Sequence, residues 1–336
     1  MNPVLKVRDV CLSYHTLSGE TPALSHISFD LMPGEFLSIV GPSGCGKSTL
    51  LNLIAGLLTP EHGSITLGGR PVSSGSAAVG YMLQKDHLLE WRSIYKNILL
   101  GLEIRKELTP EKLAHAEALL QTYGLDRFRD ARPSQLSGGM RQRAALIRTL
   151  VLEPELLLLD EPFSALDGYL KDVLQKDMQE FLKQYQGDML MVTHSRDEAF
   201  RFCNELMLLK DGKTLIFGDT RKLFEQPQLL EAARLTGCKN SSRIERMGEY
   251  QVFALDWGIS LRTEQKVELD MTHIAIRGHW IRPSEKAGEN CLVFEAAEYV
   301  ETTFEHQYLV KSPGMEDGAV LWWMRPKKSF TDEHDK

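Results

Sequence analysis

The sequence predicts an α/β protein with a largely parallel sheet, followed by a smaller β-rich domain. Short apolar runs alternate with amphipathic helical patterns up to about residue 225. Two runs, at residues 156–159 and 189–192, are apolar at every position, which is typical of parallel strands covered on both faces. The composition changes near residue 230, because four of the five tryptophans lie beyond it. We therefore expect one domain over residues 1–228 and a second over residues 229–330.

A glycine-rich loop joins the first apolar strand, residues 36–40, to a helical pattern that stops at Thr59-Pro60. A strand, a glycine-rich turn and a helix N-terminus together form an anion site, because backbone N–H groups and the helix dipole face the phosphates. Lys47 adds a positive charge, and the Ser48 hydroxyl suits Mg²⁺. The loop reads GPSGCGKST and matches the phosphate-binding pattern G-x-x-x-x-G-K-[ST], so the expected nucleotide-binding residues are Gly41, Pro42, Ser43, Gly44, Cys45, Gly46, Lys47, Ser48 and Thr49.

Residues from about 86 to 150 show no strong strand pattern and are expected to form a helical subdomain inserted into the sheet. Within it, Ser137 has the chemistry of a helix N-cap before a helix over residues 141–152. Gly138 and Gly139 permit a close approach to an anion.

Polar residues follow the two buried runs directly, as Asp160-Glu161 and as Thr193-His194. Functional groups gather beyond the C-terminal ends of parallel strands, where Asp160 can hold Mg²⁺ through water and Glu161 can activate the attacking water. For Asp160-Glu161 the alternative is an ordinary strand end followed by a helix cap. For His194 the alternative is a structural role. Ser195 and Glu198 have the spacing of a capping box that starts a helix just after His194, which favours the functional interpretation.

Composition and charge describe a soluble globular chain with 43% hydrophobic residues and a net charge of −7. Five scattered cysteines, with no C-x-x-C pair, argue against zinc and disulfides and for a reducing cytoplasm. There is no signal segment and no run of about 18 apolar residues, so another chain must supply any membrane part. We also expect Lys47 and the helix N-terminus to lower the pKa of the Cys45 thiol and make it the most reactive of the five.

The second domain carries short β-like segments separated by Gly, Pro, Asn and Asp, and we expect a small barrel-like structure with a frayed tail at residues 331–336. From Glu231 onward, 14 Lys and Arg face 18 Asp and Glu, a net charge of −4. This is the wrong sign for phosphate contacts, so nucleic acid is not an expected partner.

The motifs, taken in order, resemble the ATP-binding cassette of ABC transporters over about residues 3–225. The resemblance implies a P-loop NTPase fold and makes Glu161 the catalytic base and His194 the switch histidine at the γ-phosphate. It implies that Gln84 contacts Mg²⁺ and senses the membrane partner, and that Tyr14 stacks on adenine, although packing in a core is the alternative for Tyr14. The motifs that carry it are the phosphate-binding loop, LSGGM at 136–140, LLLLDEP at 156–162, SALD at 164–167 and Thr193-His194.

The same resemblance implies how the chain assembles. Ser137, Gly138 and Gly139 would complete the ATP site of a second cassette, so a two-fold homodimer is expected. The implied metal ligands are Ser48, Gln84 and Asp160, with ATP and Mg²⁺ as cofactors. An integral membrane permease and an extracytoplasmic substrate-binding protein are implied partners, which would place the chain at the cytoplasmic face of the membrane.

The segment LLEWR at 88–92 and the form LSGGM-RQR resemble the importer branch for nitrate, sulfonate and taurine. Met140 is common in that branch, whereas Glu90 stands where a proline is usual, in the segment that faces the permease. Residues 235–240 and 273–278 resemble the β appendage of molybdate- and sulfate-type importer ATPases, for which we favour dimerisation over ligand sensing. An exporter ATPase and a soluble cassette in translation or DNA repair are the alternatives. The LSGGM segment at 136–140, which is the signature of the family, and the switch histidine His194 exclude a kinase with the same phosphate loop.

Overall fold

The computed structural model of the chain describes residues 2–16, 19–72, 78–164, 171–172, 175–176, 178–180, 185, 187–284, 288–311 and 319–327. Residues 165–167 of the SALD segment and the tail at 331–336 lie outside the described residues. The chain forms two compact units, Met1–Leu223 and Phe224–Lys336, which we call the first and the second unit. The sequence pattern placed the boundary after residue 228.

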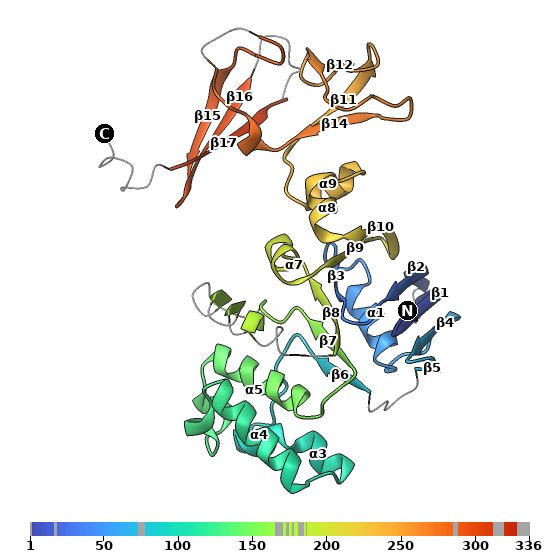
Figure 1. Cartoon of the computed structure of the whole chain (residues 1–336), viewed down its shortest axis with the longest axis vertical. Helices are drawn as coiled ribbons and strands as arrows, with labels where there is room; N and C mark the ends of the chain where they lie inside the picture. Colours follow the sequence, from blue (N-terminus) through green and yellow to red (C-terminus); the bar gives the residue numbers. More distant parts are fainter. Residues whose placement is uncertain are drawn as a thin grey trace. The chain divides into compact units, whose positions relative to one another are not determined.

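A six-stranded sheet forms the centre of the first unit, in the order β10-β9-β3-β8-β7-β6 (Figure 1). Neighbouring strands from β9 to β6 run parallel, and only β10 pairs antiparallel, with β9. The predicted parallel sheet is therefore confirmed. The strands are β3 (Phe36–Val40), β6 (Val79–Met82), β7 (Leu156–Asp160), β8 (Asp188–Thr193), β9 (Glu205–Lys210) and β10 (Lys213–Asp219).

Both faces of this sheet are covered, as the continuous apolar runs predicted. All residues of β3, β7 and β8 are buried. Because side chains alternate along a strand, Leu157 and Leu159 enter one core, and Leu156 and Leu158 enter the other. Each fully buried leucine contributes about 1.5–3 kcal/mol, so the central strands are firmly held and their C-terminal ends are fixed in place.

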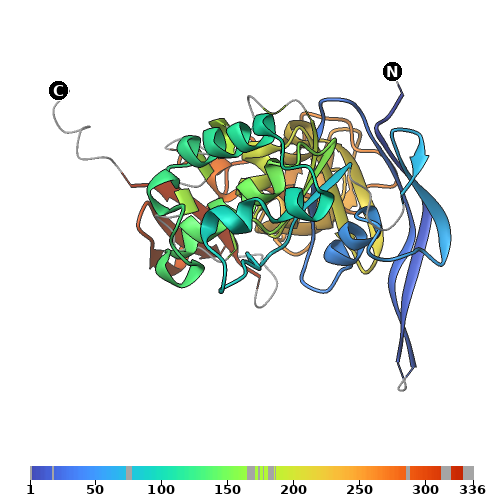
Figure 2. The same cartoon turned by 90° about the horizontal axis from the view of Figure 1, so that it is seen from below.

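An antiparallel sheet covers one face, in the order β2-β1-β4-β5, and Figure 2 shows its long hairpin on the side of the unit opposite the helices α3–α5. Helix α1 packs between this sheet and the six-stranded sheet, and together they enclose the core that contains Leu156 and Leu158. The strands are β1 (Leu5–Thr16), β2 (Gly19–Leu31), β4 (His62–Leu67) and β5 (Arg70–Pro71).

The part of the chain between β6 and β7 forms helices that cover the other face of the six-stranded sheet. The sequence predicted an inserted helical subdomain in this part of the chain. They are α2 (Ile94–Ile98), α3 (Leu100–Arg105), α4 (Pro110–Thr122) and α5 (Gly138–Leu150), with the short 3-10 helices η1 (Asp126–Phe128) and η2 (Pro133–Gln135). Among the elements whose bounds the described residues give, the first unit also contains the helices α1 (Lys47–Ile54), α7 (Arg196–Phe202) and α8 (Thr220–Glu225), which ends beyond the unit boundary. Within the described ranges, no helix combines the length and the apolar character needed to cross a bilayer.

Two helix boundaries differ from those predicted. Helix α5 begins at Gly138 rather than at residue 141, because the Ser137 hydroxyl caps it by accepting a hydrogen bond from the Met140 N–H at 3.4 Å. Helix α1 ends at Ile54, before Thr59-Pro60. Gly56 there adopts φ 72°, and the Leu57 N–H donates to the Asn52 carbonyl at 2.8 Å, which closes the helix.

The second unit contains the predicted β-rich structure as two antiparallel sheets, β13-β12-β11-β14 and β15-β16-β17 (Figure 1). Trp257, Ile259, Val310 and Leu321 share one core, so both sheets contribute to it. The elements are α9 (Leu230–Leu235), β11 (Asn240–Arg246), β12 (Gln251–Ala254), β13 (Ile259–Arg262), β14 (His273–Ile276), η3 (Gly278–Trp280), β15 (Glu295–Glu301), β16 (Glu305–Lys311) and β17 (Leu321–Pro326).

Candidate functional site

The phosphate loop, residues 41–49, leads from the end of β3 into the first turn of α1. A side chain at Gly41 would place its Cβ 2.1 Å from the Leu209 carbonyl oxygen, and Gly46 adopts φ 104°. Both positions therefore require glycine. Lys47 is buried, and its Nζ donates to the carbonyl oxygens of Gly41 at 2.9 Å and Pro42 at 2.8 Å. The loop thus curls around an ammonium group at a helix N-terminus, which is an arrangement that suits an anionic ligand.

Ser48 and Asp160 bring two hard oxygen donors together beside this loop. The Ser48 hydroxyl donates to Asp160 Oδ1 at 3.3 Å, and the Tyr81 hydroxyl donates to Asp160 Oδ2 at 3.3 Å. Burial raises the pKa of Asp160 above its ordinary value, against the lowering effect of the Ser48 hydrogen bond. A cation would relieve that cost, and Mg²⁺ is commonly held by one or two protein oxygens together with phosphates and water. The donor set therefore fits Mg²⁺.

Glu161 lies at the end of β7 in a backbone conformation that is uncommon for a non-glycine residue, with φ 46°. Its N–H donates to the Val192 carbonyl at 2.9 Å, and its own carbonyl accepts from the Ser164 hydroxyl at 2.9 Å. These bonds hold the turn after β7. Strained residues held in this way are common at functional sites, because the surrounding structure fixes the side chain in one direction.

The Glu161 carboxylate is the meeting point of three predicted residues. Gln84 Nε2 donates to its Oε2 at 3.0 Å, and His194 Nδ1 lies 3.4 Å from the same oxygen. Gln84 follows β6, Glu161 follows β7 and His194 follows β8, so three neighbouring strand ends supply the group. Gln84, predicted also as a metal ligand, is hydrogen-bonded to Glu161 rather than to Ser48 or Asp160.

Tyr14 of β1 reaches the phosphate loop through its hydroxyl, which lies 3.2 Å from the Thr49 hydroxyl. The side chain is 44% exposed, so it is not a core residue. An exposed ring beside the loop can stack on a flat ligand.

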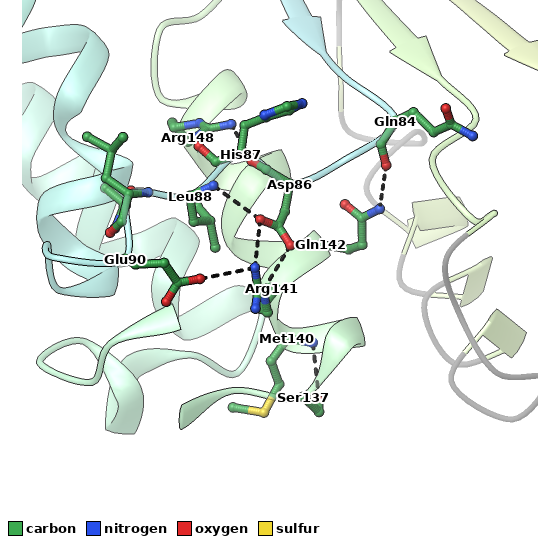
Figure 3. A network of polar contacts seen from close by, with 12 residues as sticks. Gln84, Asp86, His87, Leu88, Glu90, Ser137, Met140, Arg141, Gln142 and Arg148 are labelled. Carbon is green, nitrogen blue, oxygen red and sulfur yellow. Dashed lines mark hydrogen bonds and ion pairs between the residues drawn. The ribbon is translucent and has the colours of Figure 1, made fainter. Parts of the chain in front are cut away.

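The signature residues Ser137, Gly138 and Gly139 lie at the start of α5, next to the segment of residues 84–92, which we call the glutamine loop (Figure 3). Among the described residues, the structure joins none of the three to the phosphate loop by a hydrogen bond; the Ser137 hydroxyl accepts from Met140 instead. A pocket of about 500 Å³ is lined by residues of the glutamine loop and of the start of α5, among them Gln84, Asp86 and Gly138.

Arginines of α5 hold the glutamine loop in place (Figure 3). Arg141 Nε donates to Asp86 Oδ2 at 2.8 Å, and an Arg141 guanidinium nitrogen lies 3.3 Å from Glu90 Oε1. Arg148 donates to the carbonyl oxygens of Asp86 at 2.7 Å and His87 at 2.8 Å. Glu90, which stands where the importer branch usually has proline, thus gains a charged partner on the signature helix.

The Cys45 thiol does not have the lowered pKa that the sequence predicted; that expectation was wrong in direction. The side chain is buried, and burial raises the pKa of the thiol by more than the nearby Lys47 ammonium lowers it. The Lys47 Nζ lies 3.9 Å from the sulfur and is already bonded to two carbonyl oxygens.

We therefore expect Cys45 to react more slowly than the exposed Cys291. The cause is twofold, because Cys45 has less thiolate at a given pH and less access to reagent. Limited alkylation of the native chain at pH 8, read by mass spectrometry, measures both rates. Labelling of Cys45 as fast as Cys291 would contradict the burial described here.

Sequence patterns missed Tyr81, which lies on β6 and contacts Asp160; its position three residues before Gln84 was the available signal. The capping box at Ser195 is only half formed. The Ser195 hydroxyl accepts from the Glu198 N–H at 3.4 Å, but the Glu198 carboxylate binds the Thr193 hydroxyl and Lys171 instead of returning to Ser195.

The chain is similar to ATP-binding proteins of ABC transporters. A family model described as ABC transporter matches residues 24–164. The uncharacterized ABC transporter ATP-binding protein YtlC of Bacillus subtilis is 44% identical over 228 residues, covering 68% of this chain and 86% of that protein. The Fe(3+) ions import ATP-binding protein FbpC 2 of Haemophilus influenzae is 37% identical, covering 70% of this chain and 67% of that protein.

Two further proteins are similar to this chain: an importer ATPase whose name gives its cargo, and a cassette with a solved dimeric structure. The taurine import ATP-binding protein TauB of Yersinia pestis is 41% identical over 191 residues, covering 57% of this chain and 75% of that protein. A dimeric, post-hydrolysis structure of the ATP-binding cassette MJ0796 bound to ADP and Pi superposes with a TM-score of 0.58 at 28% identity, covering 65% of this chain and 99% of that chain.

Proposed function

This chain belongs to the ATP-binding proteins of ABC transporters, and on that premise we propose that it powers the import of a small anion through a separate membrane permease. Its reaction is the hydrolysis of ATP. The observation that carries the proposed site is the convergence of Gln84, Glu161 and His194 on one edge of the sheet, beside the phosphate loop.

ATP binds in this proposal with its phosphates on the backbone N–H groups of residues 41–49 and on the Lys47 ammonium. Lys47 then exchanges its bonds to the Gly41 and Pro42 carbonyls for bonds to phosphate oxygens. The exposed Tyr14 ring stacks on adenine. Ser48 and Asp160 hold Mg²⁺, which when bound neutralises charge on the β- and γ-phosphates.

Glu161 is the proposed base that takes the proton of the attacking water. Its turn is fixed by Val192 and Ser164, so its carboxylate points in one direction before substrate arrives. Gln84 and His194 contact the same carboxylate oxygen and restrict its orientation beside the phosphate loop. Such positioning lowers the barrier because no reorganisation is needed during the reaction.

A second copy of the cassette completes each site in this proposal. Ser137 and Gly138 are exposed at the start of α5, Gly139 is buried behind them, and no described hydrogen bond joins the three to the phosphate loop of their own chain. The backbone N–H groups at a helix N-terminus can bind an anion, here the γ-phosphate on the second cassette. The MJ0796 cassette, to which the first unit is similar, is dimeric.

The glutamine loop is the proposed docking surface for the permease, at the cytoplasmic face of the membrane. Trp91 is 71% exposed, and it lines a second pocket of about 470 Å³ with Lys96 and Arg132. An exposed tryptophan beside cations suits a helix that carries apolar and acidic residues. The second unit, whose two sheets share one core, is proposed to support dimerisation, as its resemblance to the β appendage of importer ATPases implies.

The small-anion cargo is supported by the LLEWR segment and by the taurine importer, which at 41% shares more identity with this chain than the Fe(3+) importer at 37%. Iron(III) is the second candidate cargo, because the Fe(3+) importer matches a longer part of this chain.

The test is transport by cells that lack the gene and carry it back on a plasmid, as wild type or as Glu161→Gln. We expect uptake of one labelled anion among taurine, an alkanesulfonate, nitrate and molybdate to be lost on deletion, restored by the wild type and not restored by Glu161→Gln. An extracytoplasmic binding protein for the same anion should be required. Loss of Fe(3+) uptake alone would favour the second candidate, loss of efflux would favour an exporter, and unchanged transport would reject both import proposals.

A further inference from the structure

We infer that Thr193 and Glu198 form a positioning pair that fixes His194 against Glu161, so that Glu198 acts on the reaction although it touches neither ATP nor the attacking water. The inference rests on the role proposed above for His194. It adds a buried polar connection that joins the end of β8 to α7 on the two sides of His194.

The Thr193 hydroxyl has two partners that leave it a single orientation. It donates to Glu198 Oε2, and it accepts from the Ser195 N–H at 3.0 Å. The residues on both sides of His194 are thus joined through one hydroxyl, and the His194 peptide between them is held. Thr193 also ends β8 beside Val40, the last residue before the phosphate loop, so this hydroxyl sits at the base of the site.

Glu198 is a carboxylate in the interior of the protein, with only 3% of its surface exposed. It lies on α7, which packs on β3 and β8. Its second oxygen, Oε1, lies 2.6 Å from Lys171 Nζ. A buried carboxylate is costly unless it is paired and hydrogen-bonded, and this one meets both conditions. A helix N-cap needs no such arrangement, because the Ser195 hydroxyl already accepts from the Glu198 N–H.

Lys171 holds the Glu198 carboxylate from its other side. Its ammonium lies 2.6 Å from Oε1, while Oε2 accepts from the Thr193 hydroxyl. Because both carboxylate oxygens are engaged, the acceptor of the Thr193 hydroxyl is fixed in place, and with it the backbone on both sides of His194.

The experiment measures steady-state ATP hydrolysis of the full chain for Thr193→Val, which keeps the shape of the side chain and removes the hydroxyl. We expect kcat to fall roughly tenfold, equivalent to about 1.4 kcal/mol, with KM for ATP nearly unchanged. Thr193→Ser, which keeps the hydroxyl, should restore kcat. Glu198→Leu removes the same hydrogen bond and also the ion pair to Lys171, so kcat should fall at least as far, and adding Thr193→Val to Glu198→Leu should lower kcat no further.

Thr220→Val is the matched control, since Thr220 is fully buried and its hydroxyl has no partner among the described residues. It should leave kcat unchanged. Thermal melting of every variant separates lost fold from lost positioning.

A double-mutant cycle with His194→Ala decides the inference. If Thr193 acts through His194, then Thr193→Val should cause no further loss of kcat in the His194→Ala background. Equal losses in both backgrounds, or a loss not restored by Thr193→Ser, would overturn the positioning role. A wild-type kcat in His194→Ala itself would instead reject the proposed role of the histidine, so the two failures are distinguishable.

Discussion

Replacing Lys47 by alanine should weaken the binding of ATP by roughly 10²-fold or more. Hydrogen bonds to charged groups contribute about 1.5–3 kcal/mol each, and the Lys47 ammonium already makes two bonds at the mouth of the phosphate loop. In the proposed complex, phosphate oxygens replace the two carbonyl acceptors, so the variant loses at least that much. Titration with a fluorescent ATP analogue at fixed Mg²⁺ and ionic strength measures the change.

Lys213→Ala provides the matched control for this prediction. It removes the same charge from an exposed position on β10, and ATP affinity should not change. Lys47 is buried, so a melting curve is needed to show that Lys47→Ala is folded. A folded Lys47→Ala chain that binds ATP as tightly as wild type would reject the assignment of residues 41–49 as the phosphate site.

The parts of the fold that the sequence predicted are those that short stretches determine by themselves. The runs at 156–159 and 189–192 are buried on both faces, and such burial needs an apolar residue at every position. The phosphate loop, Glu161 and His194 directly follow buried parallel strands. Predicting these strands therefore also predicted that the three lie at the same edge of the sheet. Ser137 was recognised as a cap because capping is a local interaction.

The features that the sequence missed depend on residues far apart in the chain. Tyr81 meets Asp160 only because β6 and β7 are neighbours in the sheet. Arg141 meets Asp86 because α5 packs beside the glutamine loop. The pKa of Cys45 was predicted in the wrong direction for the same reason, since the charge of Lys47 is visible in the sequence and the burial of the thiol is not.

The variant Glu161→Gln tests both ATP hydrolysis and the assembly of two chains. The amide keeps the size of the side chain and cannot take a proton from water, so hydrolysis should slow by roughly 10²–10⁴-fold while ATP still binds. Glu155→Gln, the same change at an exposed residue just before β7, should hydrolyse ATP at the wild-type rate. Phosphate release measures the first quantity and ATP titration the second. Rapid hydrolysis by Glu161→Gln would remove Glu161 from the role of base.

ATP bound to Glu161→Gln should also hold two chains together, because each phosphate loop would face the signature residues of the other chain. The association would weaken on dilution or removal of the nucleotide, as mass action requires. Sedimentation with and without ATP measures it, and the informative quantity is the increase caused by ATP, since the second unit is proposed to support dimerisation as well. No increase in a chain that demonstrably binds ATP would reject the two-cassette site.

Adding Gly138→Asp to Glu161→Gln should abolish that increase. Gly138 is the first residue of α5 and is exposed, so an aspartate there is compatible with the helix and is favoured by its dipole. The new carboxylate would face the γ-phosphate of the partner and repel it, so dimerisation is lost although the monomer remains folded and binds ATP. Gln121→Glu, on the exposed side of α4, adds the same charge and should leave the ATP-dependent dimer intact. If both changes act alike, net charge rather than the signature accounts for the loss; if neither acts, residues 137–139 do not meet the nucleotide of a second chain.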